Sequence, residues 1–299
     1  MGYFHIMKKA INILIFSALF IPAASAQIAV QPDTALEAVP MQEIVIAADR
    51  SSQSRSAVAQ QVTVLRQAEI AHANAQTTAD LMVRAGGLFV QKSQQGGGSP
   101  VLRGFEANRV LMVVDGVRMN NAIYRAGHLQ NIISLDNATL ERAEILYGPA
   151  STVYGSDALG GAICFFTKKP VLSTTEALHT TGSAFVRYGS VNQEKTAHAD
   201  ISLAGRRLGS LSSFTFSDFG DLRMGANNGF STSFGKRYYY IDRINGRDSL
   251  VHNSDPLLQR FSGYRQYDFM EKVVWRPGER ASHTLNLQYS TSSNIPVSA

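Results

Sequence analysis

The residues that could perform chemistry are scattered along this sequence rather than grouped. The seven histidines and the neighbouring Ser156 and Asp157 form neither a catalytic triad nor a metal-ligand spacing. The G-x-S-x-G, H-E-x-x-H and phosphate-loop motifs do not occur. The single cysteine, Cys164, has no partner for a disulfide, and the apolar run Ala162–Phe166 around it predicts a small buried residue. We therefore expect no enzymatic activity, no resident cofactor and no metal site.

The composition indicates polar β-structure. Charged residues make up 17% of the 299 residues, which is low against the usual quarter. The net charge is +5 and the isoelectric point is about 9.3. A basic balance can attract nucleic acid, but lysine and arginine are spread along the chain without an interleaved basic and aromatic patch. Nucleic-acid binding is therefore not expected.

The first 26 residues have the layout of a secretory signal peptide. Lys8–Lys9 precede the apolar run Ala10–Ile21, and Ala24–Ala26 form an A-x-A cleavage site. The apolar run is too short for a transmembrane anchor, which needs about 20 residues. We expect export with cleavage after Ala26, and translation could begin at Met1 or at Met7.

Residues 27–55 read as a linker that contains one isolated β-prone patch, residues 42–48. The patch is followed by the polar stretch Ser51–Ser56, so it has no neighbouring strand in the sequence. Such a strand either pairs elsewhere within its own chain or is added to the sheet edge of a partner. Both alternatives remain open at this stage.

Residues 56–170 predict a compact α+β domain. Short helices are expected at residues 66–73 and 78–84, the second capped by Thr77 or Thr78 and ended by Gly86–Gly87. The run Val110–Val114 is apolar on both faces, which predicts the centre of a small sheet. Further strands are expected at residues 62–65, 88–91, 140–146 and 162–167.

Residues 171–299 alternate between apolar and polar side chains over about five strands. On one predicted strand, Ala197, Ala199, Ile201 and Leu203 alternate with Thr196, His198, Asp200 and Ser202. On another, every second residue from Tyr267 to Trp275 is apolar (Tyr267, Phe269, Val273 and Trp275) except Glu271. This period of two is typical of a membrane β-barrel, although a soluble sandwich can give it too. The connections between strands favour the barrel. If the first strand runs outward, the short turns 205–208 and 276–281 fall on the inner side of the membrane and the long stretch 221–263 falls on the outer side, as in outer-membrane barrels.

Three stretches resemble the TonB-dependent outer-membrane receptors. Residues 42–47, QEIVIA, resemble the TonB box, although Ala47 and Ala48 stand where the family often has threonine. Residues 101–120, VLRGFEANRVLMVVDGVRMN, resemble the central motif of the plug domain of these receptors. Residues 140–163, LERAEILYGPASTVYGSDALGGAI, resemble the motif that closes the plug, over a long match without gaps.

The resemblance implies a plug domain at residues 56–170, followed by the first antiparallel strands of a 22-stranded transmembrane β-barrel in a Gram-negative outer membrane. Such a barrel needs on the order of 500 residues, so we expect a truncated barrel or a fragment that does not transport alone. The expected partners are outer-membrane lipid and TonB with its inner-membrane energising complex. TonB would bind at Glu43, Ile44, Val45, Ile46 and Ala47.

The resemblance also assigns structural roles in the plug. Arg103, Arg109 and Arg118 are expected to pair with acidic groups on the barrel wall. Asp115 and Gly116 form a turn after the apolar strand. Close approach of backbone to backbone is expected at Gly104, Gly148, Gly155, Gly160 and Gly161.

The transported ligand is the least determined feature. The stretch Asn120–Asn131 looks similar to the plug loop of haem and haemoglobin receptors, which implies that His128 could ligate haem iron. Tyr124 could assist by stacking or ligation. A ferric siderophore is the alternative ligand, bound through Tyr124 and Arg125, and a surface protein that binds without transport is a further alternative. The expected external partner is an iron complex or a haem-carrying protein.

Overall fold

The computed structural model describes residues 44–45, 53–92, 95–106, 109–119, 130–226 and 235–293. These residues belong to one compact unit, Gln42–Ala299. The predicted signal peptide and most of the predicted linker lie outside the described residues. Within the described ranges, no helix is long and apolar enough to cross a membrane.

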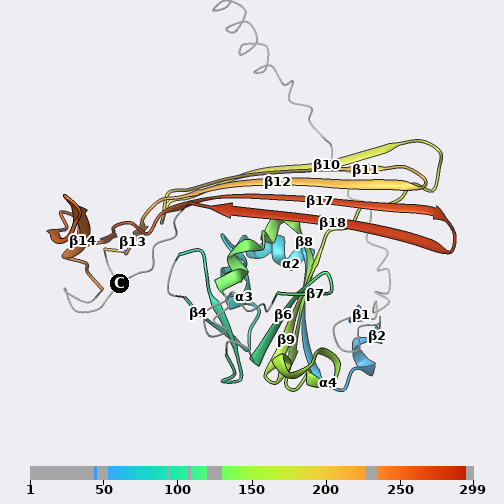
Figure 1. The fold of residues 1–299 in the computed structure, drawn as a ribbon, viewed down its shortest axis with the longest axis horizontal. Coiled ribbons are helices and arrows are strands. Elements are labelled where there is room, and N and C mark those ends of the chain that lie inside the picture. Colours follow the sequence, from blue (N-terminus) through green and yellow to red (C-terminus); the bar gives the residue numbers. More distant parts are fainter. Residues whose placement is uncertain are drawn as a thin grey trace, which may run out of the picture. The chain divides into compact units, whose positions relative to one another are not determined.

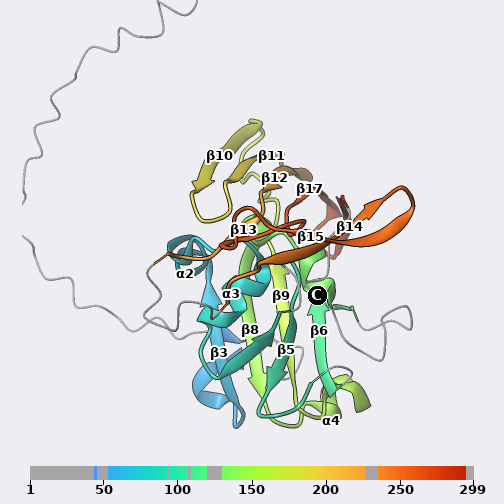
Figure 2. The ribbon, with the colours of Figure 1, turned by 90° about the vertical axis from the view of Figure 1, so that its left-hand side faces the viewer.

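Residues 53–170 form the α+β domain, which is built on a five-stranded sheet that we name the domain sheet. Its strand order is β3-β8-β9-β6-β7, with β6 parallel to β9 and the other pairs antiparallel. Figure 2 shows β3, β8, β9 and β6 of this sheet. The strands are β3 (Gln61–Arg66), β8 (Leu140–Tyr147), β9 (Gly161–Thr167), β6 (Val110–Val114) and β7 (Val117–Arg118). Every residue of β6 is buried, as its apolar sequence predicts. The middle strand is nevertheless β9, because the Asp115-Gly116 turn places the short β7 beside β6.

Two short helices and a hairpin cover one side of this sheet. Thr77 caps α3, since its hydroxyl oxygen accepts the backbone N–H of Asp80 at 3.2 Å. The neighbouring Thr78 instead donates its hydroxyl to the carbonyl of Leu135. Gly86 and Gly87 follow α3 with positive φ angles, which ends the helix. The elements are α2 (Gln67–Ala73), α3 (Thr78–Arg84), β4 (Leu88–Gln91) and β5 (Ser99–Leu102).

Shorter elements complete the domain. They are the 3₁₀ turns η1 (Arg55–Ala57), η4 (Gln130–Ser134), η5 (Asn137–Thr139) and η6 (Ser156–Ala158), and the helix α4 (Ser151–Tyr154).

The apolar core of the domain consists of two clusters of buried residues. One contains Met112, Ile163 and Phe165 and includes residues of α3. The other contains Leu111, Val113 and Cys164. Cys164 is only 2% exposed, so the prediction of a small buried residue is confirmed. Among the described residues, neither cluster includes one beyond Phe166, so both clusters lie within the domain.

The isolated β-prone patch pairs within the chain. Strand β1 (Ile44–Val45) is antiparallel to β2 (Gln53–Ser54), with Ile44 opposite Ser54. Val45 is fully buried and belongs to the second core cluster. Of the two alternatives for this patch, the structure therefore shows internal pairing.

Five long strands form a second sheet, which we name the long-strand sheet. Figure 1 shows them side by side in the order β10-β11-β12-β17-β18, and all neighbours are antiparallel. They are β10 (His179–Gly189), β11 (Glu194–Ala204), β12 (Leu208–Phe219), β17 (Tyr264–Gly278) and β18 (Ala281–Ser292). Short turns join β10 to β11, β11 to β12 and β17 to β18, as predicted.

The longer connection between β12 and β17 carries small strand pairs. Strand β13 (Leu222–Arg223) pairs with β16 (Leu258–Gln259), and β14 (Tyr239–Ile244) pairs with β15 (Arg247–His252). The connection was expected to be a long polar loop, and its hairpin instead exposes Tyr239, Ile241 and Leu250.

The two faces of the long-strand sheet differ as the period of two predicts. Ile201, Phe214, Tyr267 and Leu285 are exposed on the outward face. Thr196, His198, Thr215 and Lys272 have the opposite parity and are buried. The inward face is therefore mostly polar, with buried apolar exceptions at Leu211, Phe219, Tyr264 and Met270. The outward face is mostly apolar.

Candidate functional site: the polar interface between the α+β domain and the long-strand sheet

A buried lysine joins the inward face of the long-strand sheet to the domain sheet. Lys272 of β17 is 2% exposed, and its Nζ donates to Asp115 Oδ2 at 3.0 Å and to Thr167 Oγ1. Asp115 also accepts Asn286 Nδ2 of β18 at 2.7 Å and the Thr167 backbone N–H at 3.0 Å. We name these four residues the Lys272 clamp.

The turn after β6 makes the Lys272 clamp possible. Asp115 has a φ of +48°, a left-handed conformation that aspartate tolerates better than most residues. The turn brings its carboxylate to the end of β9, where Thr167 lies. From the sequence, Asp115 was expected only to form a turn. In the structure its carboxylate also accepts hydrogen bonds from Lys272 and Asn286 of the long-strand sheet.

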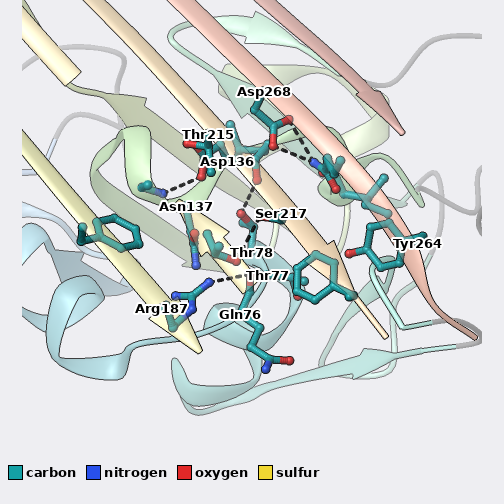
Figure 3. Close-up of a pocket in the computed structure, with 17 residues that line it drawn as sticks. Gln76, Thr77, Thr78, Asp136, Asn137, Arg187, Thr215, Ser217, Tyr264 and Asp268 are labelled. Carbon is teal, nitrogen blue, oxygen red and sulfur yellow. Dashed lines mark hydrogen bonds between the residues drawn. The ribbon is translucent and has the colours of Figure 1, made fainter. Parts of the chain in front are cut away.

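A second group of contacts runs through His198 of β11. Asp136 Oδ2 accepts the Thr215 hydroxyl at 2.5 Å, and His198 Nδ1 lies 2.7 Å from the same hydroxyl oxygen (Figure 3 shows Asp136 and Thr215). His198 Nε2 lies 3.2 Å from Asp200, which also accepts Lys168 Nζ at 2.8 Å. Asp136 and Lys168 belong to the α+β domain, so this group crosses the interface twice.

The order Thr215, His198, Asp200 has the connectivity of a hydrolase triad but not its accessibility. Thr215 and His198 are buried, and the hydroxyl that would act as nucleophile is already donated to Asp136. A triad also needs room for a substrate and donors for an oxyanion. The group is therefore suited to attachment rather than catalysis.

A third group holds the loop between α2 and α3. Arg187 of β10 pairs with Glu194 of β11 through Nε at 2.7 Å, and its Nη1 donates to the Ala75 carbonyl at 3.0 Å. Gln76 and Asn192 exchange two amide hydrogen bonds, at 3.1 and 3.0 Å. Figure 3 shows Arg187 and Gln76 beside the cavity described next. The guanidinium of Arg187 thus binds both the long-strand sheet, through Glu194, and the α+β domain, through Ala75.

A small cavity lies between these groups. Its volume is about 20 Å³, enough for about one water molecule. Gln266 on its rim donates to the Ile133 carbonyl at 2.8 Å, and Tyr264 places a buried hydroxyl nearby. At Gly96, an added Cβ would lie 2.3 Å from the Tyr264 hydroxyl oxygen, so the glycine-rich loop packs directly on β17.

In the described structure, the predicted arginines contact residues of their own domain, and their pairing with acidic groups of the wall stays a prediction. Arg103 donates to Gln61 at 2.6 Å, and Arg118 lies 3.9 Å from Asp157, both within the α+β domain. The side chain of Arg109 is exposed, and its backbone carbonyl accepts the Gly160 N–H at 2.8 Å. Among the described residues, the cations that cross to or from the long-strand sheet are Lys168, Arg187 and Lys272.

The predicted glycines lie at turns and close contacts of the domain. At Gly161, φ is +147° and an added Cβ would lie 2.3 Å from the Leu146 carbonyl oxygen. At Gly160, an added Cβ would lie 2.3 Å from the Cβ of Phe105. Positive φ angles also occur at Gly104, Gly116, Gly148 and Gly155.

The remaining predicted site residues fall largely outside the described ranges. His128, Tyr124 and Arg125 lie outside them, as do Glu43, Ile46 and Ala47. Ile44 and Val45 are described, and Val45 packs on the α+β domain. Within the described ranges, no group of three or more histidine, cysteine or acidic residues could hold a metal ion.

Sequence reasoning did not single out Lys272, Asp136, Arg187 or Gln76. The only available signal was the parity of the strands, which places Thr196, His198 and Asp200 on the polar face. The parity of a residue along a strand predicts which face of the sheet it lies on, but not which residue of the α+β domain it contacts.

Comparisons with known proteins agree with this architecture. The model of the TonB-dependent Receptor Plug Domain family matches residues 54–162. The vitamin B12 transporter BtuB of Vibrio vulnificus (strain CMCP6) is 29% identical over 273 residues, which cover 85% of this chain and 43% of the transporter.

Two solved structures share the fold. The Pseudomonas aeruginosa receptor FpvA, solved with heterologous pyoverdines and iron, has a TM-score of 0.60 at 16% identity and covers 83% of this chain and 27% of its own. The alcaligin outer membrane receptor FauA from Bordetella pertussis has a TM-score of 0.57 at 18% identity. The match covers 84% of this chain and 35% of FauA. The chain spans less than half of each of these three proteins.

Proposed function

We propose that this chain, which carries the plug domain and first antiparallel strands of a TonB-dependent receptor, serves the TonB-driven uptake of a bulky metal-containing compound across the outer membrane. The α+β domain is the plug, and the long-strand sheet is the part of the wall that follows it. Glu43, Ile44, Val45, Ile46 and Ala47 are the proposed TonB-binding segment, and the ligand would approach from the side of the long connection between β12 and β17.

The polar interface is the observation that supports uptake best. A plug that must open needs contacts that hold it and can exchange with water, and hydrogen bonds and ion pairs meet this need because water can replace them. The plug meets the wall through the Lys272 clamp, the His198 group and the Arg187 group. Its apolar core does not extend into the wall. The plug could therefore move without exposing that core.

The proposed ligand class is a metal chelate of the siderophore or vitamin B12 type. The curated relative is named for vitamin B12, one structural neighbour was solved with pyoverdines and iron, and the other is named for alcaligin. The haem hypothesis receives no support from these relatives. It stays a prediction that rests on His128, and haemin titration of wild type against His128→Ala, followed by the Soret band, would test it.

Uptake by cells that carry the full-length receptor as their sole receptor tests the proposal. The probes are ferric pyoverdine, ferric alcaligin, vitamin B12 and haemin. We expect saturable uptake of one metal chelate, and we expect Ile44→Pro to abolish that uptake while binding persists, because proline removes a backbone donor from the strand that would pair with TonB.

Ile44→Ala is the matched control, since it shortens the side chain but keeps the backbone N–H. It should retain most of the uptake. Normal uptake by the proline variant would contradict the role of residues 43–47, and a receptor that binds all four probes without transporting any would contradict uptake itself.

A further inference from the structure

An acidic residue, Glu271, lies in the middle of the mostly apolar outward face of the long-strand sheet, whereas the other outward acidic residue, Asp218, lies at a strand end and pairs with Arg265. Glu271 shares the parity of Tyr267, Phe269 and Trp275 on β17, which are all exposed. Its Oε2 accepts the hydroxyl of Ser212, which lies directly opposite on β12, at 2.5 Å. We name these two residues the Glu271–Ser212 pair.

The surroundings of the pair are apolar. Leu287 lies opposite Glu271 on β18, and Ile201 lies opposite Ser212 on β11. Both are exposed, as are Phe214 and Leu285 beside them. The pair lies between strands β11 and β18 of this chain, so the residues next to it in the sheet all belong to the described structure. In the described part of the chain, no salt bridge reaches Glu271, and its side chain makes its hydrogen bond with Ser212.

The depth of Glu271 follows from the aromatic residues on the same strand, given the proposed outer-membrane location. Tyr267 and Trp275 lie four residues to either side, or about 14 Å along the strand at about 3.4 Å per residue. Strand tilt of about 40° reduces this to about 10 Å of depth, within an apolar band about 25 Å tall. Glu271 therefore lies near the middle of the band that would face lipid.

A carboxylate at that depth lacks a natural partner in lipid. Acyl chains offer no hydrogen-bond donor, and head groups lie at the edges of the band. Ionisable residues within a membrane-facing surface are rare and pair with one another or with other polar groups. Ser212 satisfies one oxygen of the carboxylate but does not neutralise its charge.

We propose that the Glu271–Ser212 pair is the centre of a docking surface for a second membrane-embedded protein, which presents a lysine or arginine at mid-depth. Charge complementarity carries this assignment, and the exposed Ile201, Phe214, Leu285 and Leu287 supply the apolar rim. The inference rests on the outer-membrane location in the proposed function but not on the transported ligand.

A second copy of this chain fits the pair less well. On the described outward face, the basic residues are Lys195, Arg265 and His283, and each lies within the first three residues of its strand. None of them is at the depth of Glu271. A second copy would instead bring a second glutamate to the contact.

Site-specific photo-crosslinking in the outer membrane tests the proposal. A photoreactive residue replaces Leu287, next to Glu271, in the full-length receptor, and the matched control position is Val186, an exposed outward residue on β10. We expect an adduct from position 287 and none from position 186. Glu271→Gln, which keeps the hydrogen bond but removes the charge, should reduce the adduct on the order of tenfold or more.

The partner must then be identified through its contact residue. Mass spectrometry of the adduct should find a lysine or arginine in the crosslinked peptide, and changing that residue to glutamate should abolish the adduct. Combining that change with Glu271→Lys should restore it. Ser212→Ala keeps the charge and should retain most of the adduct, which guards against loss through misfolding.

Several results would overturn the inference. They are equal adducts at positions 287 and 186, an adduct only between two copies of the receptor, an adduct only with lipid, and an adduct unchanged by Glu271→Gln. Uptake of the metal chelate is measured in the same cells. Failed uptake with an intact, charge-dependent adduct would count against the proposed function and leave the docking surface standing.

Discussion

The two five-stranded sheets of this chain use apolar residues in opposite ways. The domain sheet is buried on both faces, and its strand β6 is buried at every position. The long-strand sheet places most of its apolar residues outward and most of its polar residues against the plug. A burial pattern alone therefore does not identify a core, because in the second sheet most of the buried side chains are polar. The two sheets thus separate an apolar core within the plug from a largely polar interface whose hydrogen bonds water can replace.

The largest effect should come from crowding the domain sheet. Gly161→Val adds a branched side chain where a Cβ would lie 2.3 Å from the Leu146 carbonyl oxygen, so we expect a loss of about 3 kcal/mol or more in the free energy of unfolding. The reaction of Cys164 with a thiol reagent in increasing urea measures plug unfolding, since this single cysteine is buried.

Gly104→Ala is the control for this variant. Gly104 has a positive φ, but an added Cβ would meet nothing within 4 Å. The expected cost is only about 1–2 kcal/mol, from the left-handed backbone. Equal losses for the two variants would mean that packing against Leu146 is not what requires glycine at position 161.

The next effect should come from the interface. Lys272→Met keeps most of the unbranched apolar stem of the side chain but leaves the Asp115 carboxylate without its cation. Removing one partner of a buried ion pair costs about 3–5 kcal/mol, and we expect about 3 kcal/mol because Asp115 is partly accessible. The measurement is again the urea concentration at which Cys164 reacts.

The double variant Lys272→Met with Asp115→Asn tests the cause of this loss. It removes both charges, so it should recover a large part of the stability. A double variant that is no more stable than Lys272→Met alone would show that the charge left on Asp115 does not explain the loss.

The sequence was sufficient for the local elements but not for the interface. The cap at Thr77, the helix end at Gly86–Gly87 and the strand at Val110–Val114 depend on neighbouring residues, so local rules predicted them. Lys272 and Asp115 are 157 positions apart, and no local rule links them. The sequence therefore did not single out Lys272, and in the described structure Arg103 and Arg118 contact residues of the plug. Their predicted pairing with acidic groups of the wall stays a prediction.

The pairing of β1 with β2 shows the same limit on a smaller scale. Gln53 and Ser54 have low strand propensity, so the sequence shows no neighbour for Ile44 and Val45. The burial of Val45 among Leu111, Val113 and Cys164 explains why the pairing occurs despite that propensity. Tertiary packing overrode the local preference here.

A smaller effect should follow from weakening the Arg187 group without removing its charge. Arg187→Lys keeps the cation beside Glu194 but loses the forked geometry that also reaches the carbonyls of Ala75 and Gln76. We expect a loss of about 1 kcal/mol, equivalent to one hydrogen bond, in the same urea measurement. A loss as large as that of Lys272→Met would indicate that the backbone contacts, rather than the ion pair, dominate at this end of the plug.

The smallest effect should come from an ion pair that lies away from the plug. Arg206 donates to Glu176, and both side chains are more than half exposed, at 62% and 77%. Exposed pairs are screened by water and salt and contribute at most about 1 kcal/mol, so Glu176→Gln should change the free energy of unfolding by less than about 0.5 kcal/mol. Raising the salt concentration should leave the difference between this variant and wild type near zero, whereas the loss in Lys272→Met should persist because Lys272 is buried. A loss above about 1 kcal/mol in Glu176→Gln would contradict the comparison, since an exposed pair would then hold the chain as strongly as a buried one.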